Sequence, residues 1–177
     1  MVMDMGRDAA QEVVELEYRP TTEDYAAALW ERRRFSRAGR RIWWLIGLLV
    51  VLAGLNAALG LADGDVDLFL LIWPLLSALL LLLAPRLQAR QVMRVAARNG
   101  LYRAAVSDAG VTVTTDNASS TINWAAQPRY REIRDAFVVF SADKNATCFT
   151  VLPKRGLRES ADVDRLRTLL DRNLTRA

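Results

Sequence analysis

Two long runs of apolar residues interrupt a chain in which polar and apolar positions are otherwise mixed. Residues 42–62 and residues 68–85 contain no charged side chain. A helix of roughly 20 apolar residues is long enough to cross the roughly 30 Å hydrocarbon core of a bilayer. As a buried pair in a soluble protein, two such helices would need apolar partners on every side, and no other part of the chain is large enough to supply them. The pattern predicts two transmembrane spans, at about residues 42–62 and 67–85.

The connection between the spans is short and acidic. Residues 63–67 hold three aspartates and Gly64, so the two helices must be antiparallel neighbours in a hairpin over residues 42–85. The loop has no basic residue, whereas arginines gather at the other end of both spans. These arginines are Arg32, Arg33, Arg34, Arg37, Arg40 and Arg41 before the hairpin, and Arg86, Arg90, Arg94 and Arg98 after it. Because basic residues mark the cytoplasmic side, we expect a multi-pass protein of the cell membrane with both termini in the cytoplasm.

Small residues recur at four-residue spacing in the first span. Ala53 and Ala57 form one such row, and Gly54, Ala58 and Ala62 form another; such a face permits close helix approach. It either packs against the second span of the same hairpin or mediates self-association into a homo-oligomer. Asn56 is the only strongly polar side chain inside either span, and we expect its amide to hydrogen-bond across a helix interface.

The segments that flank the hairpin show their own periodicity. Residues 13–18 alternate apolar and acidic positions, as an exposed strand would. Thr21 or Thr22 then precedes two acidic residues, which is typical of a helix N-cap. We therefore expect residues 1–41 to form a cytoplasmic strand and a helix that leads into the membrane.

After the second span, residues 86–100 predict a juxtamembrane helix that ends at Gly100. Arg86, Arg90 and Arg94 recur every four residues along it. This stripe is either a solvated stalk or a face held against anionic lipid headgroups.

From residue 101 onward the hydrophobic period changes to two. Six short runs of β-prone residues are separated by turn-forming stretches, and a helix with Ser160 as its N-cap and Arg172 and Arg176 at its end closes the chain. The six runs are residues 101–107, 111–115, 121–124, 130–134, 137–141 and 147–152. The predicted fold is α+β: the two-helix hairpin plus a cytoplasmic domain over residues 101–177, an antiparallel meander closed by one helix and pleckstrin-homology-like in shape. The strand at residues 13–18 is placed to complete that sheet.

Several of these segments together resemble a known family. They are the strands at residues 121–124 and 136–140, the Val-Leu-Pro-Lys-Arg-Gly-Leu sequence of residues 151–157, and the upstream Tyr18 with residues 22–25. In this order and spacing around a helical hairpin they resemble the YcxB-like membrane proteins. The resemblance implies a two-span protein of the bacterial inner membrane, with a pleckstrin-like C-terminal domain in the cytoplasm and no established activity.

Composition narrows the chemistry that the chain can perform. It has no histidine, and its one cysteine is Cys148, so imidazole metal sites, histidine-based triads and internal disulfides are excluded. We find no glycine-rich phosphate loop, and cap positions account for the carboxylates. The net charge of +4 is too small for a nucleic-acid partner. We therefore expect no catalysis, no cofactor and no bound metal.

The function that remains is binding at the membrane. We expect a non-catalytic module held by the lipid bilayer at the inner leaflet, whose ligand is a protein or an anionic lipid headgroup. The alternative is a structural or accessory subunit of a larger membrane complex or homo-oligomer. The candidate binding residues in the soluble domain are Lys154 and Arg155, which Pro153 presents at a turn. If these two side chains form no binding site, we expect them to be solvated or to pair with Glu159 and Asp162.

Overall fold

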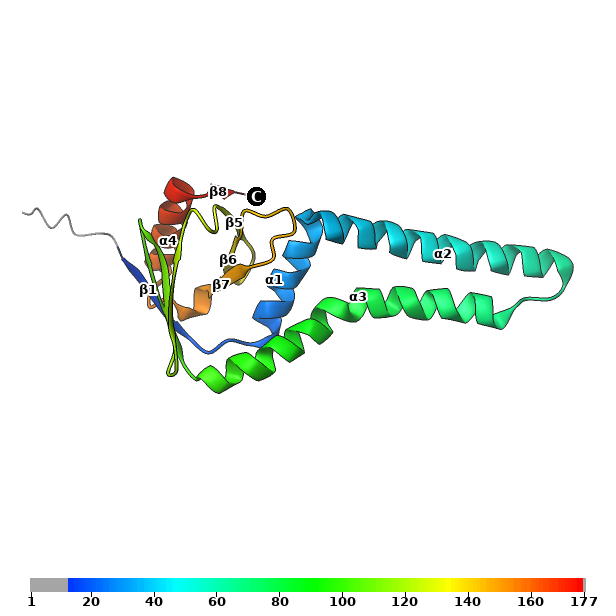
Figure 1. The fold of residues 1–177 in the computed structure, drawn as a ribbon, viewed down its shortest axis with the longest axis horizontal. Helices are drawn as coiled ribbons and strands as arrows, with labels where there is room; N and C mark the ends of the chain where they lie inside the picture. The colour runs from blue at the N-terminus through cyan, green and yellow to red at the C-terminus, as the bar shows by residue number, and fades with distance from the viewer. Residues whose placement is uncertain (1–12, 177) are drawn as a thin grey trace, which may run out of the picture. The chain divides into compact units, whose positions relative to one another are not determined.

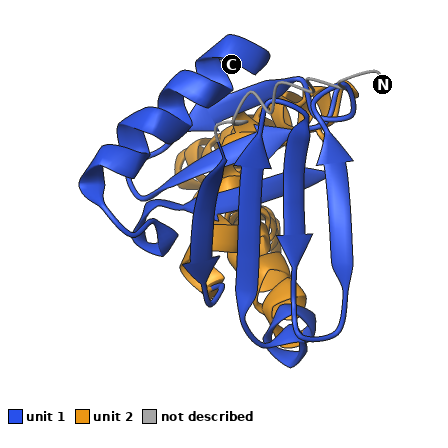
Figure 2. Cartoon of the chain, turned by 90° about the vertical axis from the view of Figure 1, so that its left-hand side faces the viewer, with its two compact units in different colours: residues 1–20, 95–142, 147–177 blue, residues 21–94, 143–146 orange. Residues whose placement is uncertain are grey.

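The structure is a computed structural model and describes residues 13–176, so the expectations for residues 1–12 and 177 lie outside it. The chain divides into two compact units, coloured separately in Figure 2. We call residues 1–20, 95–142 and 147–177 the β unit. Residues 21–94 and 143–146 are the hairpin unit. Each is described by itself.

The first sheet of the β unit has the order β1-β2-β3-β4, and all its pairs are antiparallel. Its strands are β1 (Val14–Tyr18), β2 (Tyr102–Ser107), β3 (Gly110–Thr114) and β4 (Ser119–Asn123). In β1 the alternating sequence places Val14, Leu16 and Tyr18 in the core and leaves two glutamates exposed. This strand pairs with β2, although the whole hairpin separates the two strands in the sequence, so β1 does complete the sheet.

The second sheet has the order β7-β6-β5-β8. Its strands are β5 (Arg129–Glu132), β6 (Ala136–Phe140), β7 (Phe149–Pro153) and the short β8 (Thr175–Arg176), which runs parallel to β5. All six expected runs contain a strand, but one continuous meander is wrong, because β4 and β5 belong to different sheets. The chain turns between them, where Gln127 N donates to Trp124 O at 3.1 Å. Pro128, which follows, has no N–H to donate to a ladder.

Helix α4 (Ser160–Asn173) buries Leu166, Leu169 and Leu170 in the core of the β unit. Two details of its ends differ from expectation. The N-cap is Glu159, one residue before the expected Ser160, and its backbone N–H donates to the Asp162 carboxylate at 3.3 Å. Arg176 lies in β8 beyond the helix, so only Arg172 occupies the last helical turn.

The hairpin unit consists of α1 (Thr22–Phe35), α2 (Arg37–Asp63) and most of α3 (Leu68–Ala96). Thr21 caps α1 by exchanging hydrogen bonds with Asp24, as its sequence indicates. Helices α2 and α3 run side by side in opposite directions (Figure 1) and are long and apolar enough to cross a membrane. Large apolar side chains such as Trp44 and Leu61 are exposed along them, which fits two lipid-facing spans.

Helix α3 continues through Pro85 without a break. The second span and the expected juxtamembrane helix are therefore one helix rather than two segments. It passes into the 3₁₀ turn η1 (Ala97–Asn99) and ends at Gly100, whose φ of +70° favours glycine. The fold class is α+β, as expected, and the pleckstrin-like assignment stays a prediction.

Candidate membrane-proximal site

Of the two expected rows of small residues in α2, the one that contains Ala53 lies on the buried face of the helix. Ala53 is buried, and a side chain at Gly60 would meet the Val66 backbone at 2.7 Å. Gly54, Ala58 and Ala62 are instead exposed, and a Cβ at Gly54 would have no neighbour within 4 Å. Packing inside the hairpin is therefore observed for Ala53 and not for the row of Gly54, Ala58 and Ala62. A turn of about 100° per residue puts the two rows on adjacent faces of the same helix.

Asn56 uses its amide within the hairpin, but its partner belongs to the loop and not to the facing helix. Its Nδ2 donates to Asp67 O at 2.9 Å. Asp67 also caps α3, because its Oδ1 accepts from the backbone N–H groups of Phe69 and Leu70. The Asn56 side chain thus connects α2 to the end of the loop.

Exposed arginines surround the opposite end of the hairpin. They are Arg37, Arg40 and Arg41 at the start of α2, and Arg86, Arg90 and Arg94 along α3. None of these six forms an ion pair with another residue in the described part of the chain. We call them the arginine ring. The loop at the other end carries Asp65 and Asp67, so the two ends of the hairpin differ in charge.

A cavity of about 180 Å³ lies between α1, α2 and α3 at the arginine end. Its polar lining comes from Arg32, Arg33, Ser36 and Gln88. Its apolar lining comes from Leu29, Ile42, Leu81, Ala84 and Pro85, among others. Ser36 is also the N-cap of α2, and its Oγ accepts from Gly39 N at 2.9 Å.

Arg33 is the most buried charged side chain of this site, with 6% of its surface exposed. Its guanidinium lies 5.8 Å from the ring centroids of both Trp30 and Trp43. Its Nη1 donates to Leu81 O at 2.6 Å. That carbonyl is four residues before Pro85, which has no N–H for it, so Arg33 supplies the donor that the helix lacks. The arginine therefore joins α1 to α3.

The remaining donors of Arg33 are not used. Its Nε and Nη2 have no hydrogen-bond partner among residues 13–176. Burial lowers the pKa of Arg33 from its ordinary value. Sequence reasoning placed Arg33 among the flanking arginines and missed its burial. The available signal was Pro85, because a proline inside a helix leaves the carbonyl four residues earlier without its usual donor.

Lys154 and Arg155, the candidates in the soluble domain, lie in the 3₁₀ turn η2 (Lys154–Gly156) after β7. Lys154 Nζ contacts Glu132 Oε1 at 2.6 Å, and Arg155 Nη2 donates to Arg19 O at 2.9 Å. The expected partner for Lys154, Glu159 or Asp162, is thus wrong. The sheet order β7-β6-β5 brings Glu132 within reach of Lys154. That order depends on contacts between residues far apart in the sequence, so local patterns do not predict it.

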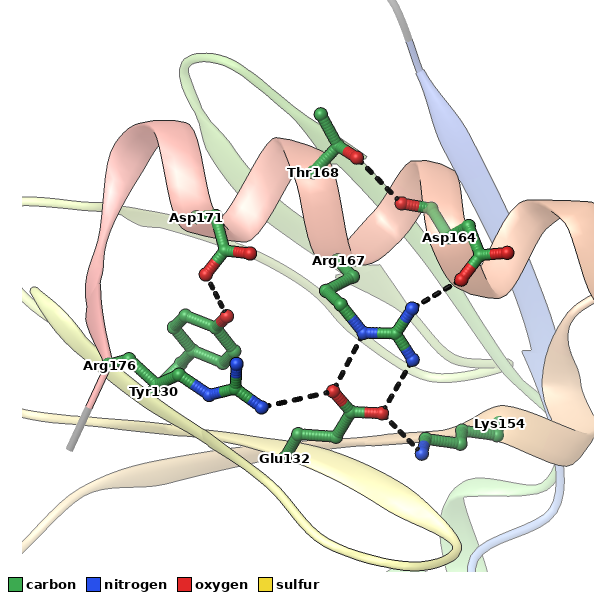
Figure 3. Close-up of polar contacts among 8 residues, drawn as sticks. All are labelled: Tyr130, Glu132, Lys154, Asp164, Arg167, Thr168, Asp171 and Arg176. Atoms are coloured by element: carbon green, nitrogen blue, oxygen red, sulfur yellow. Dashed lines mark hydrogen bonds and ion pairs between the residues drawn. The ribbon is translucent and has the colours of Figure 1, made fainter.

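Glu132 is the centre of a charge cluster, defined here as Glu132, Lys154, Arg167 and Arg176 (Figure 3). Arg167 holds the carboxylate with two hydrogen bonds of 2.8 Å, and Arg176 lies 3.6 Å away. The hydrogen bonds from Arg167 and then Lys154 lower the pKa of Glu132 to about 2. Because Glu132 lies in β5 and Arg167 in α4, their contact stabilises the docking of α4 on the second sheet.

Tyr130 adds a neighbouring contact from β5. Its hydroxyl donates to the Asp171 carboxylate of α4 (Figure 3), and burial raises the pKa of Tyr130 to about 12. Cys148 is exposed. Within residues 13–176, no three His, Cys, Asp or Glu side chains come together as a set of metal ligands.

Comparison with known proteins adds one finding. Residues 106–170 match the family model of the YcxB-like proteins, which runs here from β2 to α4. No curated protein and no solved structure matches the chain. The resemblance that the sequence indicates is thus confirmed over these residues. Residues 106–170 are similar to the YcxB-like proteins, and the two apolar helices fit a two-span membrane hairpin.

Proposed function

We propose that this chain is a membrane-tethered, non-catalytic binding module whose β unit is held at the inner leaflet. The observation that carries the proposal is the arginine ring, six exposed cations without an ion pair among the described residues, at the ends of two apolar spans. Each basic residue near an anionic bilayer surface contributes about 1 kcal/mol of attraction. The ring therefore favours an anionic ligand at the membrane surface, either a lipid headgroup or an acidic protein.

The pairing of β1 with β2 supports a hairpin with both ends on one side. These strands flank the two spans in sequence, and they can hydrogen-bond only if they lie on the same side of the membrane. The charge difference between the arginine ring and the acidic loop favours the cytoplasm as that side.

The alternative function is a structural or accessory subunit. The outward row of Gly54, Ala58 and Ala62 favours it, because exposed small residues on a span permit close approach of another helix. In that case the protein forms a homo-oligomer or docks on a larger membrane complex.

Thiol labelling tests the orientation. Cys148 is exposed in the β unit and serves as the natural reporter. In a Cys148→Ser background, Asp65→Cys introduces a thiol in the loop, where it avoids the φ of +77° at Gly64. We expect Asp65→Cys to react with a membrane-impermeant maleimide on intact cells, and Cys148 of the natural chain to react only after lysis. The reverse pattern would move the β unit to the outer side of the membrane.

Native mass spectrometry of the full-length protein in mild detergent separates the two functions. The binding module predicts a protomer that retains a lipid or an acidic protein, and loses it as ionic strength rises because screening weakens the arginine ring. A multiple of the protomer mass with no other bound molecule would instead favour the structural subunit. Gly54→Leu should dissociate such a multiple.

A further inference from the structure

Arg33 is a buried charge whose counter-charge is missing from the described part of the chain. A guanidinium stays protonated in proteins, and a buried ion without an opposite charge or full hydrogen bonding is costly. The two tryptophan rings and Leu81 O satisfy part of it. Two of its nitrogens remain without a hydrogen-bond partner. An anion would satisfy both the charge and these donors.

The cavity that Arg33 lines is suited to an anion for a second reason. Helix α2 begins there, and Ser36, Ala38 and Gly39 of its first turn are part of the lining. The first turn of a 27-residue helix carries the positive end of its dipole, where backbone N–H groups favour negative charge. Arg32 adds a second cation to the same lining. At about 180 Å³ the cavity has room for a phosphate group.

The rest of the lining indicates what the anion is attached to. Ile42 and Leu81 belong to the two apolar spans, and Ala84 and Pro85 continue this apolar surface along α3. The lining therefore combines cations with apolar side chains of the two lipid-facing helices. A phosphate with hydrocarbon chains fits this lining better than an acidic peptide, which has no chains to lay along the spans.

We propose that this cavity binds the phosphate of one anionic glycerophospholipid and that Arg33 is its main ligand. This site rests on the proposed function, since it requires the arginine end of the hairpin to lie at a leaflet that supplies such a lipid. It also gives Arg33 two roles from one position. Nη1 holds the carbonyl that Pro85 leaves open, and the fork formed by Nε and Nη2 receives two phosphate oxygens.

The test uses the full-length protein in mild detergent, after delipidation, titrated with three probes. They are phosphatidylglycerol, phosphatidylcholine and inorganic phosphate. We expect native mass spectrometry to show one tightly bound phosphatidylglycerol per chain, and the melting temperature to rise with this lipid alone. Equal effects of phosphatidylcholine would overturn the preference for an anionic lipid. A response to inorganic phosphate but not to the lipid would show a free-phosphate site and overturn the proposal.

Arg33→Gln removes the charge and the fork, and its shorter side chain also loses the contact with Leu81 O. We expect it to weaken phosphatidylglycerol binding by about tenfold or more, because charge-assisted hydrogen bonds are lost. Arg34→Gln removes the same charge from an exposed position next to Arg33 in α1, where Arg34 pairs with Glu31 outside both the cavity lining and the arginine ring. It is the matched control, with an expected change within about twofold. Arg33→Lys keeps the charge without the fork and should fall between them. Equal weakening by Arg33→Gln and Arg34→Gln would mean that the surface charge of the protein binds lipid and the cavity does not.

The two proposals fail in different ways. If lipid binding is the same in Arg33→Gln and the natural protein, the cavity is not the site, but the binding module stands. If the natural protein retains neither lipid nor protein partner, the proposed function itself fails. If Arg33→Gln does not fold, the titrations of the natural protein still decide, since a melting temperature that phosphatidylglycerol leaves unchanged contradicts the site.

Discussion

Replacing Glu132 by glutamine is expected to destabilise the β unit by about 3 kcal/mol at neutral pH. The substitution keeps the shape of the side chain but removes the charge that Arg167 and Lys154 share. Glu132 has only 12% of its side chain exposed, so these cations lose a largely buried partner. Urea denaturation of the full-length protein in mild detergent, followed by circular dichroism, measures the loss as a lower midpoint.

The same residue predicts how stability depends on pH. The pKa of Glu132 falls from 4.5 to about 2 in the folded protein, which corresponds to about 3 kcal/mol of stability at neutral pH. A lowered carboxyl pKa contributes stability that is complete above pH 4.5 and is lost as the pH falls toward 2. The difference in unfolding free energy between the natural protein and Glu132→Gln should therefore shrink over this window.

Glu15→Gln is the matched control for this experiment. Glu15 pairs with Arg158 at 3.4 Å, but both side chains are more than half exposed. An exposed pair of this kind contributes at most about 1 kcal/mol, so the midpoint should scarcely move. Equal losses in the two variants, or a difference for Glu132→Gln that stays constant from pH 7 to pH 2, would show that the charge cluster does not stabilise the fold.

Gly39→Ala is expected to have the second large effect, in the hairpin unit. A Cβ at this position would lie 1.8 Å from Arg33 O, a backbone atom of α1 that no side-chain rotation can move. The corner between α1 and α2 must open to admit it, and overpacking of this kind costs about 1–3 kcal/mol or more. We expect a lower melting temperature of the full-length protein in mild detergent.

Gly47→Ala separates this steric effect from helix propensity. Both glycines lie in α2, and alanine favours a helix over glycine by about 1 kcal/mol. At Gly47, however, the new Cβ has no neighbour within 4 Å. The control should be neutral or slightly more stable, and matching melting temperatures for the two variants would refute the close approach of α1 and α2.

Local patterns account for what the sequence predicts correctly. The two spans follow from uncharged length, the cap at Thr21 from its neighbours in the first turn, and the positions of the strands from alternation. Each of these signals is contained in a few adjacent residues. These local signals are enough to predict the fold class, because the fold class depends only on which helices and strands are present.

Long-range partners account for what the sequence does not predict. Glu132 is 22 residues from Lys154 and 35 from Arg167, and Arg33 is 48 residues from Leu81. Such pairs depend on which strands and helices become neighbours. Which face of α2 is exposed also depends on a long-range partner. Both rows of small residues have helical spacing, and only the path of α3 decides that Ala53 faces inward.

With the hairpin spanning the membrane as proposed, the position of β1 makes the first sheet depend on membrane insertion. Strand β1 is the first described element to leave the ribosome, yet its partner β2 is made only after both spans. Until then its apolar residues Val14, Leu16 and Tyr18 are uncovered, and Glu15 and Glu17 between them oppose pairing with other chains. If either span fails to insert, β1 and β2 end on opposite sides of the bilayer and the sheet lacks its edge strand. Completion of the β unit therefore reports that the hairpin has been correctly inserted.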